Sequence, residues 1–161
     1  EIVEENGGTA VRSRVGHSYI KALMSETGAV FGGEHSGHFY FRDFWRADSG
    51  MLAALHAIAA LGESDDSLSL LLAPFNRYIS SGEINSTVKD AVAATKEIET
   101  IYGAQAGVEL DYLDGLTVTG DTWWFNLRAS NTEPLLRLNV EATTAKEMAA
   151  IRDAVLNTIR A

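Results

Sequence analysis

Two successive regions with different hydrophobic patterns predict an α/β domain followed by an α+β domain. Up to residue 66, helical and strand-like runs follow in the order helix, strand, strand, helix, without a tight hairpin signal, which suggests an α/β layer. Beyond it, alternating strand-like runs and two amphipathic helices predict a mostly antiparallel sheet with two helices on one face. Because 161 residues suit one domain or two small ones, we divide the chain into domains 1–66 and 67–161.

The first region is expected to hold two helices and two short strands. Gly28 follows the first helix at a position that favours a left-handed cap. Asp48 and Ser49 precede the second helix as N-cap candidates, and its apolar residues line one face: Leu52, Leu55, Ile58 and Ala59. The predicted elements are a helix over 19–26, strands over 29–31 and 38–41, and a helix over 51–61.

A polar segment is the predicted boundary between the two domains. Residues 62–67 contain Gly, two Ser and two Asp, which is typical of a connecting loop. Residues 68–79 then carry the apolar stripe of a helix, interrupted by Pro74, which should kink or split it. We interpret this segment as a linker helix into the second domain.

The second region alternates strands with helices. Asp114-Gly115 between two strand-like runs is a strong type I′ hairpin signal. On the predicted helix over 90–102, Val92, Ile98 and Ile101 are expected to face inward. In the last strand, apolar residues alternate with Arg137, Asn139 and Glu141. The predicted elements are strands over 84–88, 108–113, 116–119, 122–128 and 135–142, and helices over 90–102 and 144–159.

Composition limits the partners. The net charge of −9 argues against nucleic acid, and it requires any anion site to be built locally from a few arginines. The chain has no cysteine, which fits a reducing cytoplasm, and no apolar run reaches the roughly 18 residues of a membrane span. The acidic start resembles the middle of a helix ended by Asn6-Gly7-Gly8, so we expect the protein to continue upstream.

Residues 128–134 concentrate groups that bind phosphate. The Arg128 guanidinium offers bidentate, charge-assisted hydrogen bonds, Ser130 and Thr132 add hydroxyls, and Asn131 adds an amide. If the flanking strands pair around this loop, Arg137 approaches the same anion. The alternative is an ordinary surface turn with two solvated arginines.

A second loop, residues 32–38, carries Glu34, Ser36 and His38 at alternate positions. An extended backbone would project these three side chains to one side, where they suit vicinal sugar hydroxyls. A zinc site is the alternative, but no third well-spaced His or Cys ligand accompanies them.

Four segments, in order, resemble the α-D-phosphohexomutase family. Residues 33–38 resemble its sugar-recognition loop and residues 128–134 its phosphate-binding loop. Residues 48–50 resemble the Asp-x-Gly that opens the following helix, and residues 15–21 resemble a Gly-His-x-x-Ile-Lys segment. Within the family, the resemblance is closest to the phosphomannomutase/phosphoglucomutase group of actinobacterial type.

The resemblance covers only the C-terminal part of the family pattern: most of the third domain and all of the fourth. The phosphoserine loop and the Asp-Gly-Asp-x-Asp-Arg magnesium loop of full-length members do not occur in these residues. The resemblance implies a cytoplasmic parent enzyme, an intramolecular phosphotransferase that interconverts hexose 1-phosphate and hexose 6-phosphate of mannose or glucose. It also implies a bisphosphate intermediate, a phosphorylated serine, and Mg²⁺ bound outside this segment.

The resemblance also implies roles for single residues. Lys21 and His38 would assist catalysis, and no metal ligand is expected in this segment. We expect the segment alone to be inactive, to depend on the N-terminal domains of the same protein, and to self-associate through an exposed sheet edge. Three alternatives remain: a phosphoglucosamine mutase, a non-catalytic phosphosugar-binding module and a structural interaction domain. Asn131 argues against the first of these. The implied substrate-binding residues are Glu34, Ser36 and His38, and the implied phosphate-binding residues are Arg128, Ser130, Asn131, Thr132 and Arg137.

Overall fold

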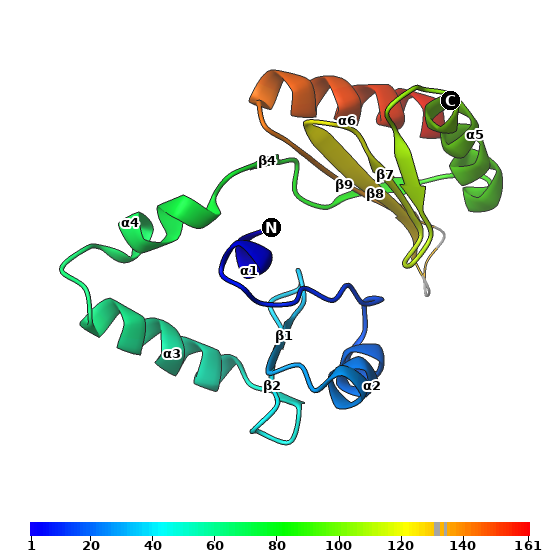
Figure 1. The fold of residues 1–161 in the computed structure, drawn as a ribbon. Coiled ribbons are helices and arrows are strands. Elements are labelled where there is room, and N and C mark those ends of the chain that lie inside the picture. Colours follow the sequence, from blue (N-terminus) through cyan, green and yellow to red (C-terminus); the bar gives the residue numbers. More distant parts are fainter. Residues whose placement is uncertain (131–132, 134) are drawn as a thin grey trace. The chain divides into compact units, whose positions relative to one another are not determined.

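The computed structural model describes residues 1–130, 133 and 135–161. The chain forms two compact units, Glu1–Phe75 and Asn76–Ala161, and Figure 1 shows the elements of each. The boundary predicted after residue 66 precedes this division, and residues 67–75 belong to the first unit. In the described part of the chain, no helix is long and apolar enough to cross a membrane.

The first unit contains a three-stranded antiparallel sheet in the order β1-β2-β3. The predicted α/β class of this region is confirmed, but β1 and β2 pair directly, Gly33 with Phe39, as an antiparallel hairpin that the sequence did not signal. A turn closed by the Gly37 N–H donating to the Glu34 carbonyl, with Gly37 at φ +82°, makes this chain reversal possible. The elements are α1 (Ile2–Glu5), α2 (His17–Thr27), β1 (Phe31–Gly33), β2 (Phe39–Phe41), β3 (Ala47–Asp48), α3 (Gly50–Gly62), α4 (Leu68–Leu72) and the 3₁₀ turn η1 (Ala73–Phe75).

A small core joins α2 to the sheet. Ile20 and Met24, one helical turn apart, are buried together with Tyr40 of β2. Gly32 of β1 allows this close approach, because a Cβ there would lie 3.0 Å from the Ile20 side chain. The predicted cap is confirmed: Gly28 has φ +71° and its N–H donates to the Met24 carbonyl.

α3 keeps its predicted position but leaves its apolar face open. The Ser49 hydroxyl accepts from the Leu52 N–H at 3.2 Å, which confirms the N-cap. No residue of α3, all of which is described, is buried, and Leu55 and Ile58 are 56% and 64% exposed. The short sheet of the first unit therefore does not cover this helix.

The predicted interruption of the helix over 68–79 at Pro74 is confirmed, but residues 76–79 are not helical. α4 ends at Leu72, η1 contains Pro74, and Ile79 lies in strand β4 (Ile79–Ser80). Proline lacks the N–H that would continue the α-helical ladder, and its ring clashes with the preceding turn. The chain is therefore free to extend, and β4 pairs with strand β9 (Leu135–Ala142).

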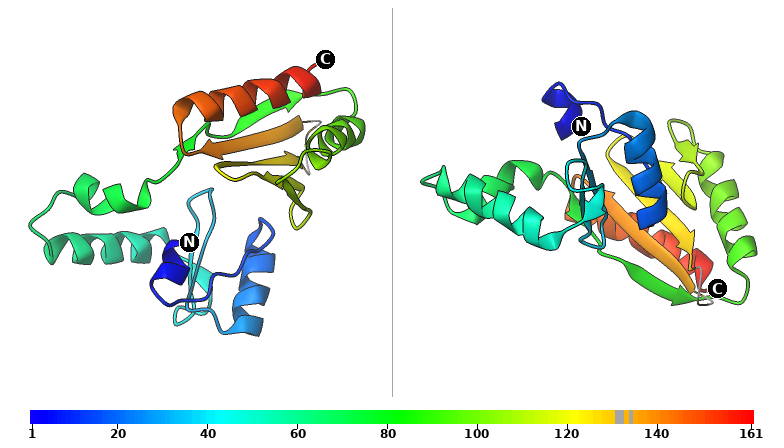
Figure 2. Two further views of the ribbon diagram at one scale, coloured as in Figure 1. Left: turned by 45° about the horizontal axis from the view of Figure 1, so that its top comes forward. Right: turned by 90° about the horizontal axis from the view of Figure 1, so that it is seen from below.

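The second unit confirms the predicted α+β fold. Within the described residues, six strands form one antiparallel sheet in the order β4-β9-β8-β7-β6, with β5 also paired to β9. Both helices cover the same face of this sheet (Figures 1 and 2). The remaining elements are β5 (Ile84–Thr87), α5 (Ala91–Gly103), β6 (Glu109–Asp111), β7 (Leu116–Thr119), β8 (Trp123–Ala129), β9 (Leu135–Ala142) and α6 (Ala145–Ile159).

The core of the second unit lies between the sheet and the two helices. The predicted alternation in β9 is confirmed, since every second residue from Leu136 to Ala142 is buried. On α5, Ile98 is buried as predicted, but Val92 and Ile101 are exposed and Tyr102 takes the second inward position. Val92 precedes Ile98 by six residues and, at about 100° per residue, lies on another face.

The hairpin between β6 and β7 forms as predicted, but not with a type I′ turn. Asp111 pairs with Thr117, so the connection is longer than two residues. Only Gly115 in this connection has a positive φ, +76°, whereas a type I′ turn needs two such residues. A Cβ on Gly115 would lie 2.7 Å from the Leu127 carbonyl oxygen, so the close backbone approach also requires glycine.

Candidate functional site

Two arginines stand opposite each other on the polar face of the second unit's sheet. Arg128 of β8 and Arg137 of β9 are direct partners in the antiparallel register. Their neighbours Leu127, Leu136 and Leu138 are buried, so the guanidinium groups project from the face that the helices leave open. Like charges directly opposite each other destabilise a sheet, and a bound anion relieves this repulsion.

Each arginine also has a carboxylate neighbour. Arg128 Nη1 lies 3.6 Å from Asp114 Oδ2, and Arg137 Nη1 lies 3.8 Å from Glu83 Oε2. Both distances exceed that of a charge-assisted hydrogen bond, so these ion pairs orient the guanidinium groups without saturating their donors. Arg137 Nε is buried and has no hydrogen-bond partner within the described residues. A buried donor of this kind is uncommon and favours an acceptor on this face.

The loop between these strands is closed at its base. The Ser130 N–H donates to the Leu135 carbonyl at 2.8 Å, and the Leu135 N–H donates to the Glu133 carbonyl at 2.8 Å. Ser130 therefore directly follows β8, the strand that carries Arg128. The predicted ligands Asn131 and Thr132 lie outside the described residues, and their roles stay predictions.

The predicted sugar loop is the connection between β1 and β2 in the first unit. The Glu34 N–H donates to the His38 carbonyl at 2.9 Å, so the loop is a tight turn and the assumed extended backbone is wrong. The turn nevertheless brings Ser36 and His38 together, with 2.8 Å between Ser36 Oγ and His38 Nδ1. This contact uses only Nδ1, so His38 Nε2 remains a further donor or acceptor, according to the tautomer.

The Glu34 carboxylate is already held by the protein. Its Oε1 accepts a hydrogen bond from the Tyr40 hydroxyl, and its Oε2 accepts from the Gly16 N–H at 3.3 Å. Burial of Tyr40, and next the hydrogen bond to Glu34, raise the pKa of the Tyr40 phenol well above its usual range. Tyr40 therefore remains a donor at neutral pH. Sequence reasoning missed Tyr40, although it follows the loop and lies at the alternate position after His38.

The remaining candidates are less constrained. Lys21 is exposed on α2, and its assisting role stays a prediction. Among the residues that the structure describes, no group of three or more His, Cys, Asp or Glu side chains is placed to hold a metal ion.

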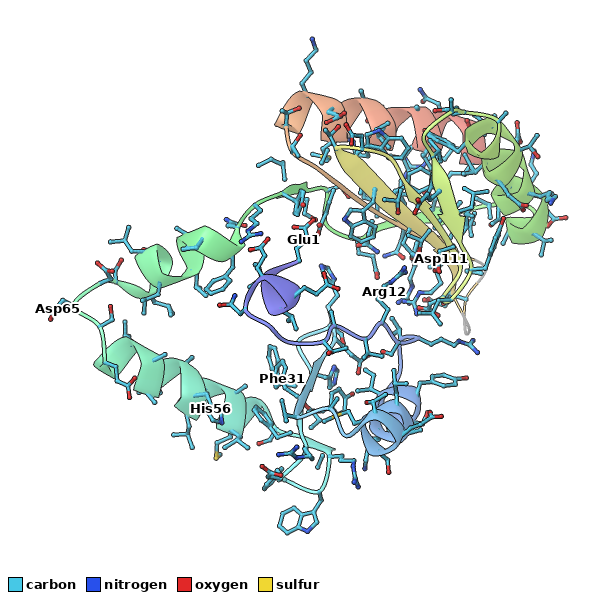
Figure 3. All side chains as sticks on the ribbon, in the orientation of Figure 1. Glu1, Arg12, Phe31, His56, Asp65 and Asp111 are labelled. Carbon is cyan, nitrogen blue, oxygen red and sulfur yellow. The ribbon has the colours of Figure 1, made fainter. Side chains whose placement is uncertain are left out.

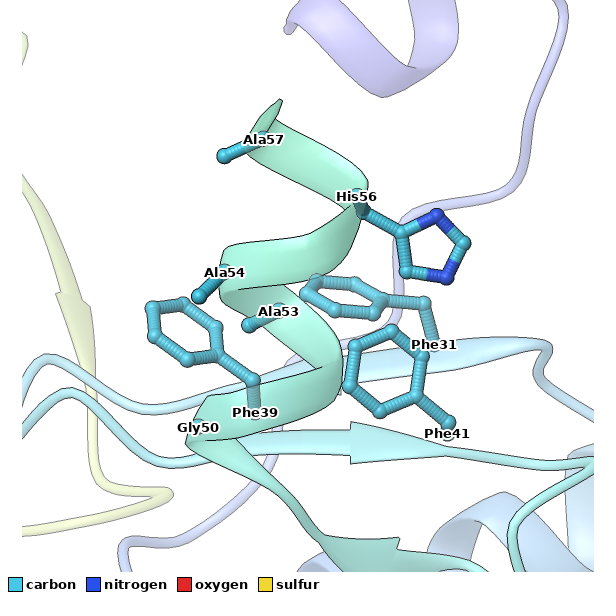
Figure 4. A pocket seen from close by; sticks show the side chains of 8 residues that line it. All are labelled: Phe31, Phe39, Phe41, Gly50, Ala53, Ala54, His56 and Ala57. Atoms are coloured by element: carbon cyan, nitrogen blue, oxygen red, sulfur yellow. The ribbon is translucent and has the colours of Figure 1, made fainter. Parts of the chain in front are cut away.

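A separate apolar pocket of about 770 Å³ lies between α3 and the hairpin of the first unit. Figure 3 marks Phe31 on β1 and His56 on α3, and Figure 4 shows the pocket from close by. His56 stacks on Phe41 with 5.4 Å between ring centroids. No carboxylate or guanidinium lines this pocket, so it does not suit a phosphate. Its lining residues are Phe31, Phe39, Phe41, Gly50, Ala53, Ala54, His56 and Ala57.

Two family models match the two halves of the chain. Residues 1–78 match the model described as phosphoglucomutase/phosphomannomutase, alpha/beta/alpha domain III. Residues 83–158 match the model described as phosphoglucomutase/phosphomannomutase, C-terminal domain. The chain belongs to the phosphoglucomutase/phosphomannomutase family. The resemblance found in the sequence motifs is thereby confirmed, including its restriction to the third and fourth domains.

Relatives in this family carry mutase names. A phosphomannomutase of Methanocaldococcus jannaschii is 46% identical over 148 residues, 92% of this chain and 32% of that protein. Proteins named phosphohexose mutases from Xanthomonas campestris pv. campestris are 49% identical over 142 residues, 88% of this chain and 32% of theirs. An Escherichia coli K12 phosphomannomutase is 41% identical over 143 residues, 88% of this chain and 31% of its own length.

A solved structure shares the fold. The crystal structure of a phosphoglucomutase/phosphomannomutase family protein from Burkholderia thailandensis matches with a TM-score of 0.81 and 30% sequence identity. The match covers 98% of this chain and 34% of that one. The chain thus spans about a third of the length of these relatives.

Proposed function

We propose that this chain is the C-terminal substrate-binding part of a phosphomannomutase/phosphoglucomutase. The parent enzyme interconverts hexose 1-phosphate and hexose 6-phosphate through a bisphosphate intermediate, with mannose or glucose as the sugar. The observation that carries the proposal is the facing pair of Arg128 and Arg137 on the open face of the sheet, in a chain with net charge −9.

The second unit supplies the phosphate site. Two guanidinium groups offer several N–H donors in planar, fork-like geometry, which matches phosphate oxygens. Ser130, Asn131 and Thr132 add donors from the adjoining loop. A reorienting bisphosphate needs such a site, because the phosphate that does not react must be bound equally in both orientations of the sugar.

The first unit supplies the sugar site. Glu34 accepts hydrogen bonds from sugar hydroxyls, and Ser36 and His38 donate or accept beside it. These groups discriminate a sugar from a simple anion, because a carboxylate repels phosphate but accepts hydrogen bonds from hydroxyl groups. Lys21 supports the same site from α2.

The chemical step depends on parts of the parent outside this chain. We propose that a phosphorylated serine donates the phosphoryl group there, and that Mg²⁺ supplies electrostatic stabilisation when bound. The described residues do not fit that ion, since they hold no carboxylate cluster. We propose further that the parent is a cytoplasmic phosphoprotein and that this chain alone binds substrate without converting it.

Two measurements test the proposal. In an NMR titration with mannose 1-phosphate, we expect shifts centred on Arg128, Ser130 and the Glu34–His38 loop. Arg128→Ala should weaken binding by about 1.5–3 kcal/mol, the range for hydrogen bonds to a charged group. Arg152→Ala, which removes the same charge from α6, should leave affinity unchanged within about 0.5 kcal/mol.

The assay for turnover uses the purified chain with mannose 1-phosphate, Mg²⁺ and a bisphosphate activator. We expect no product above a blank without protein. Turnover that disappears in Arg128→Ala would show that the chain holds its own phosphoryl donor. In the NMR titration, chemical-shift changes that avoid both the Arg128–Ser130 segment and the Glu34–His38 loop would contradict the assignment of the binding site.

A further inference from the structure

Both oxygens of the Glu34 carboxylate are held by groups from other segments of the first unit. The Tyr40 hydroxyl comes from β2 and donates to Oε1, while the Gly16 N–H comes from the start of α2 and donates to Oε2. The hydrogen bonds span six and eighteen positions of the sequence. Two other segments of the chain therefore converge on one side chain of the predicted sugar loop.

The two donors are themselves fixed in place. Tyr40 is only 1% exposed, and it packs with Ile20 and Met24 of α2 in the small core. Gly16 has φ +129°, a backbone conformation that L side chains rarely adopt, and it is the N-cap residue of α2. The donors therefore do not have to be ordered when a ligand binds, and they restrict the carboxylate to one orientation.

The arrangement leaves acceptor capacity on the carboxylate. An ionised carboxylate has about four lone-pair sites, and the protein occupies one on each oxygen. One site on each oxygen remains, and Glu34 is only partly buried. Two acceptor oxygens on one planar group match two neighbouring hydroxyls, which is the arrangement of a sugar diol.

We propose that Tyr40 is a positioning residue, which together with the Gly16 N–H fixes the Glu34 carboxylate so that it accepts hydrogen bonds from a vicinal diol of the sugar. The proposal rests on the proposed function, in which the Glu34–His38 loop binds the sugar. The positioning adds a basis for specificity, because a carboxylate fixed in one plane favours hydroxyl pairs of one spacing and orientation. Tyr40 itself does not touch the ligand.

The first test compares two probes. Tyr40→Phe keeps the buried ring and removes only the hydroxyl. It should weaken binding of mannose 1-phosphate about tenfold, as measured by isothermal titration calorimetry, which corresponds to the loss of one net hydrogen bond between Glu34 and the sugar. Inorganic phosphate, which lacks a diol, should bind with unchanged affinity. The matched control is Tyr19→Phe, which removes the hydroxyl of a half-exposed tyrosine in the same unit.

A double-mutant cycle separates positioning from general destabilisation. Glu34→Gln should weaken mannose 1-phosphate binding at least as much as Tyr40→Phe does. The double variant should show no further loss beyond Glu34→Gln alone, because Tyr40 acts only through Glu34. Additive losses, or equal losses for both probes, would overturn the proposal.

A measurement without ligand keeps this inference distinct from the proposed function. The ¹³C relaxation of the Glu34 side chain should show a restricted carboxylate in the original chain and a mobile one in Tyr40→Phe. Unchanged mobility would overturn the positioning role whether or not sugar binds. Restricted Glu34 together with no binding of mannose 1-phosphate by the original chain would instead contradict the proposed function.

Discussion

Arg128 and Arg137 are cross-strand partners, so two positive side chains share one position of the β8–β9 ladder. Their ion pairs with Asp114 and Glu83 are long and partly exposed, and pairs of this kind contribute little to stability. The arrangement is therefore unfavourable for the fold by itself and suited to an anion. Proteins commonly retain such unfavourable groups where they bind ligands.

Arg137→Met should separate the cost of the arginine pair to folding from its contribution to anion binding. The substitution removes the repulsion and the unpaired buried Nε, so the free energy of unfolding of the second unit should stay unchanged or rise by about 0.5–1 kcal/mol. Affinity for hexose phosphate should fall about tenfold or more. Urea denaturation at low salt and a calorimetric titration measure the two quantities. Arg152→Met is the control, and a destabilised Arg137→Met with normal affinity would refute this interpretation.

The second unit was predictable from sequence because its strands are long enough to show their period. In β9, four buried residues alternate with polar ones, and this alternation fixes both the core face and the open face. Once β8 and β9 are paired, the position of Arg128 opposite Arg137 follows. One exception was α5, where periodicity placed Val92 on the wrong face because a helix offers several apolar stripes.

The first unit was less predictable. Periodicity identified α3 but not whether anything covers its apolar face, and Leu55 and Ile58 are exposed. The chain reversal that turns Glu34 toward Tyr40 depends on Gly37 and on pairing of three-residue strands, which are too short to show a period. Tyr40 also looked like an ordinary strand aromatic, since its hydroxyl acquires a role only through the fold.

Phe125 should carry much of the second unit's stability. Its side chain is 0% exposed, and its ring contacts Tyr102 edge-on at 4.9 Å between centroids. Phe125→Ala should lower the free energy of unfolding by about 3–5 kcal/mol, because it removes buried apolar surface and leaves a cavity. Val92→Ala, at an 81% exposed position of α5, should change it by less than about 0.5 kcal/mol. Equal effects in urea denaturation would show that the described core is wrong.

The start of α5 depends on one side chain. Asp90 Oδ1 accepts hydrogen bonds from the N–H groups of Val92 and Ala93, at 2.9 and 3.0 Å. Asp90→Ala should therefore cost about 1 kcal/mol of unfolding free energy, whereas Asp90→Asn keeps an acceptor and should cost much less. Thermal denaturation of the three proteins compares them. A loss in Asp90→Asn as large as in Asp90→Ala would mean that the charge, and not the cap, is responsible.

The hydroxyl of Tyr40 should make the first unit sensitive to alkali. Burial, followed by the hydrogen bond to Glu34, raises the pKa of Tyr40 above the value of about 10 that it has in an unfolded chain. The folded state thus holds this proton more tightly than the unfolded state does. The resulting contribution to stability is fully present below about pH 10 and is lost progressively as the pH rises above that value toward the folded-state pKa.

Tyr40→Phe removes this titration and keeps the ring. The difference in unfolding free energy between the original chain and Tyr40→Phe should therefore be constant from pH 7 to about pH 9.5 and shrink at higher pH. Residue-resolved hydrogen exchange in the first unit follows this difference without interference from the second unit, where burial also raises the pKa of Tyr102. Tyr102→Phe is the matched control, since it should flatten the alkaline loss only in the second unit. A difference in the first unit that stays constant up to pH 11 would mean that the Tyr40 hydroxyl ionises equally in both states, and that it does not hold Glu34 in the folded protein.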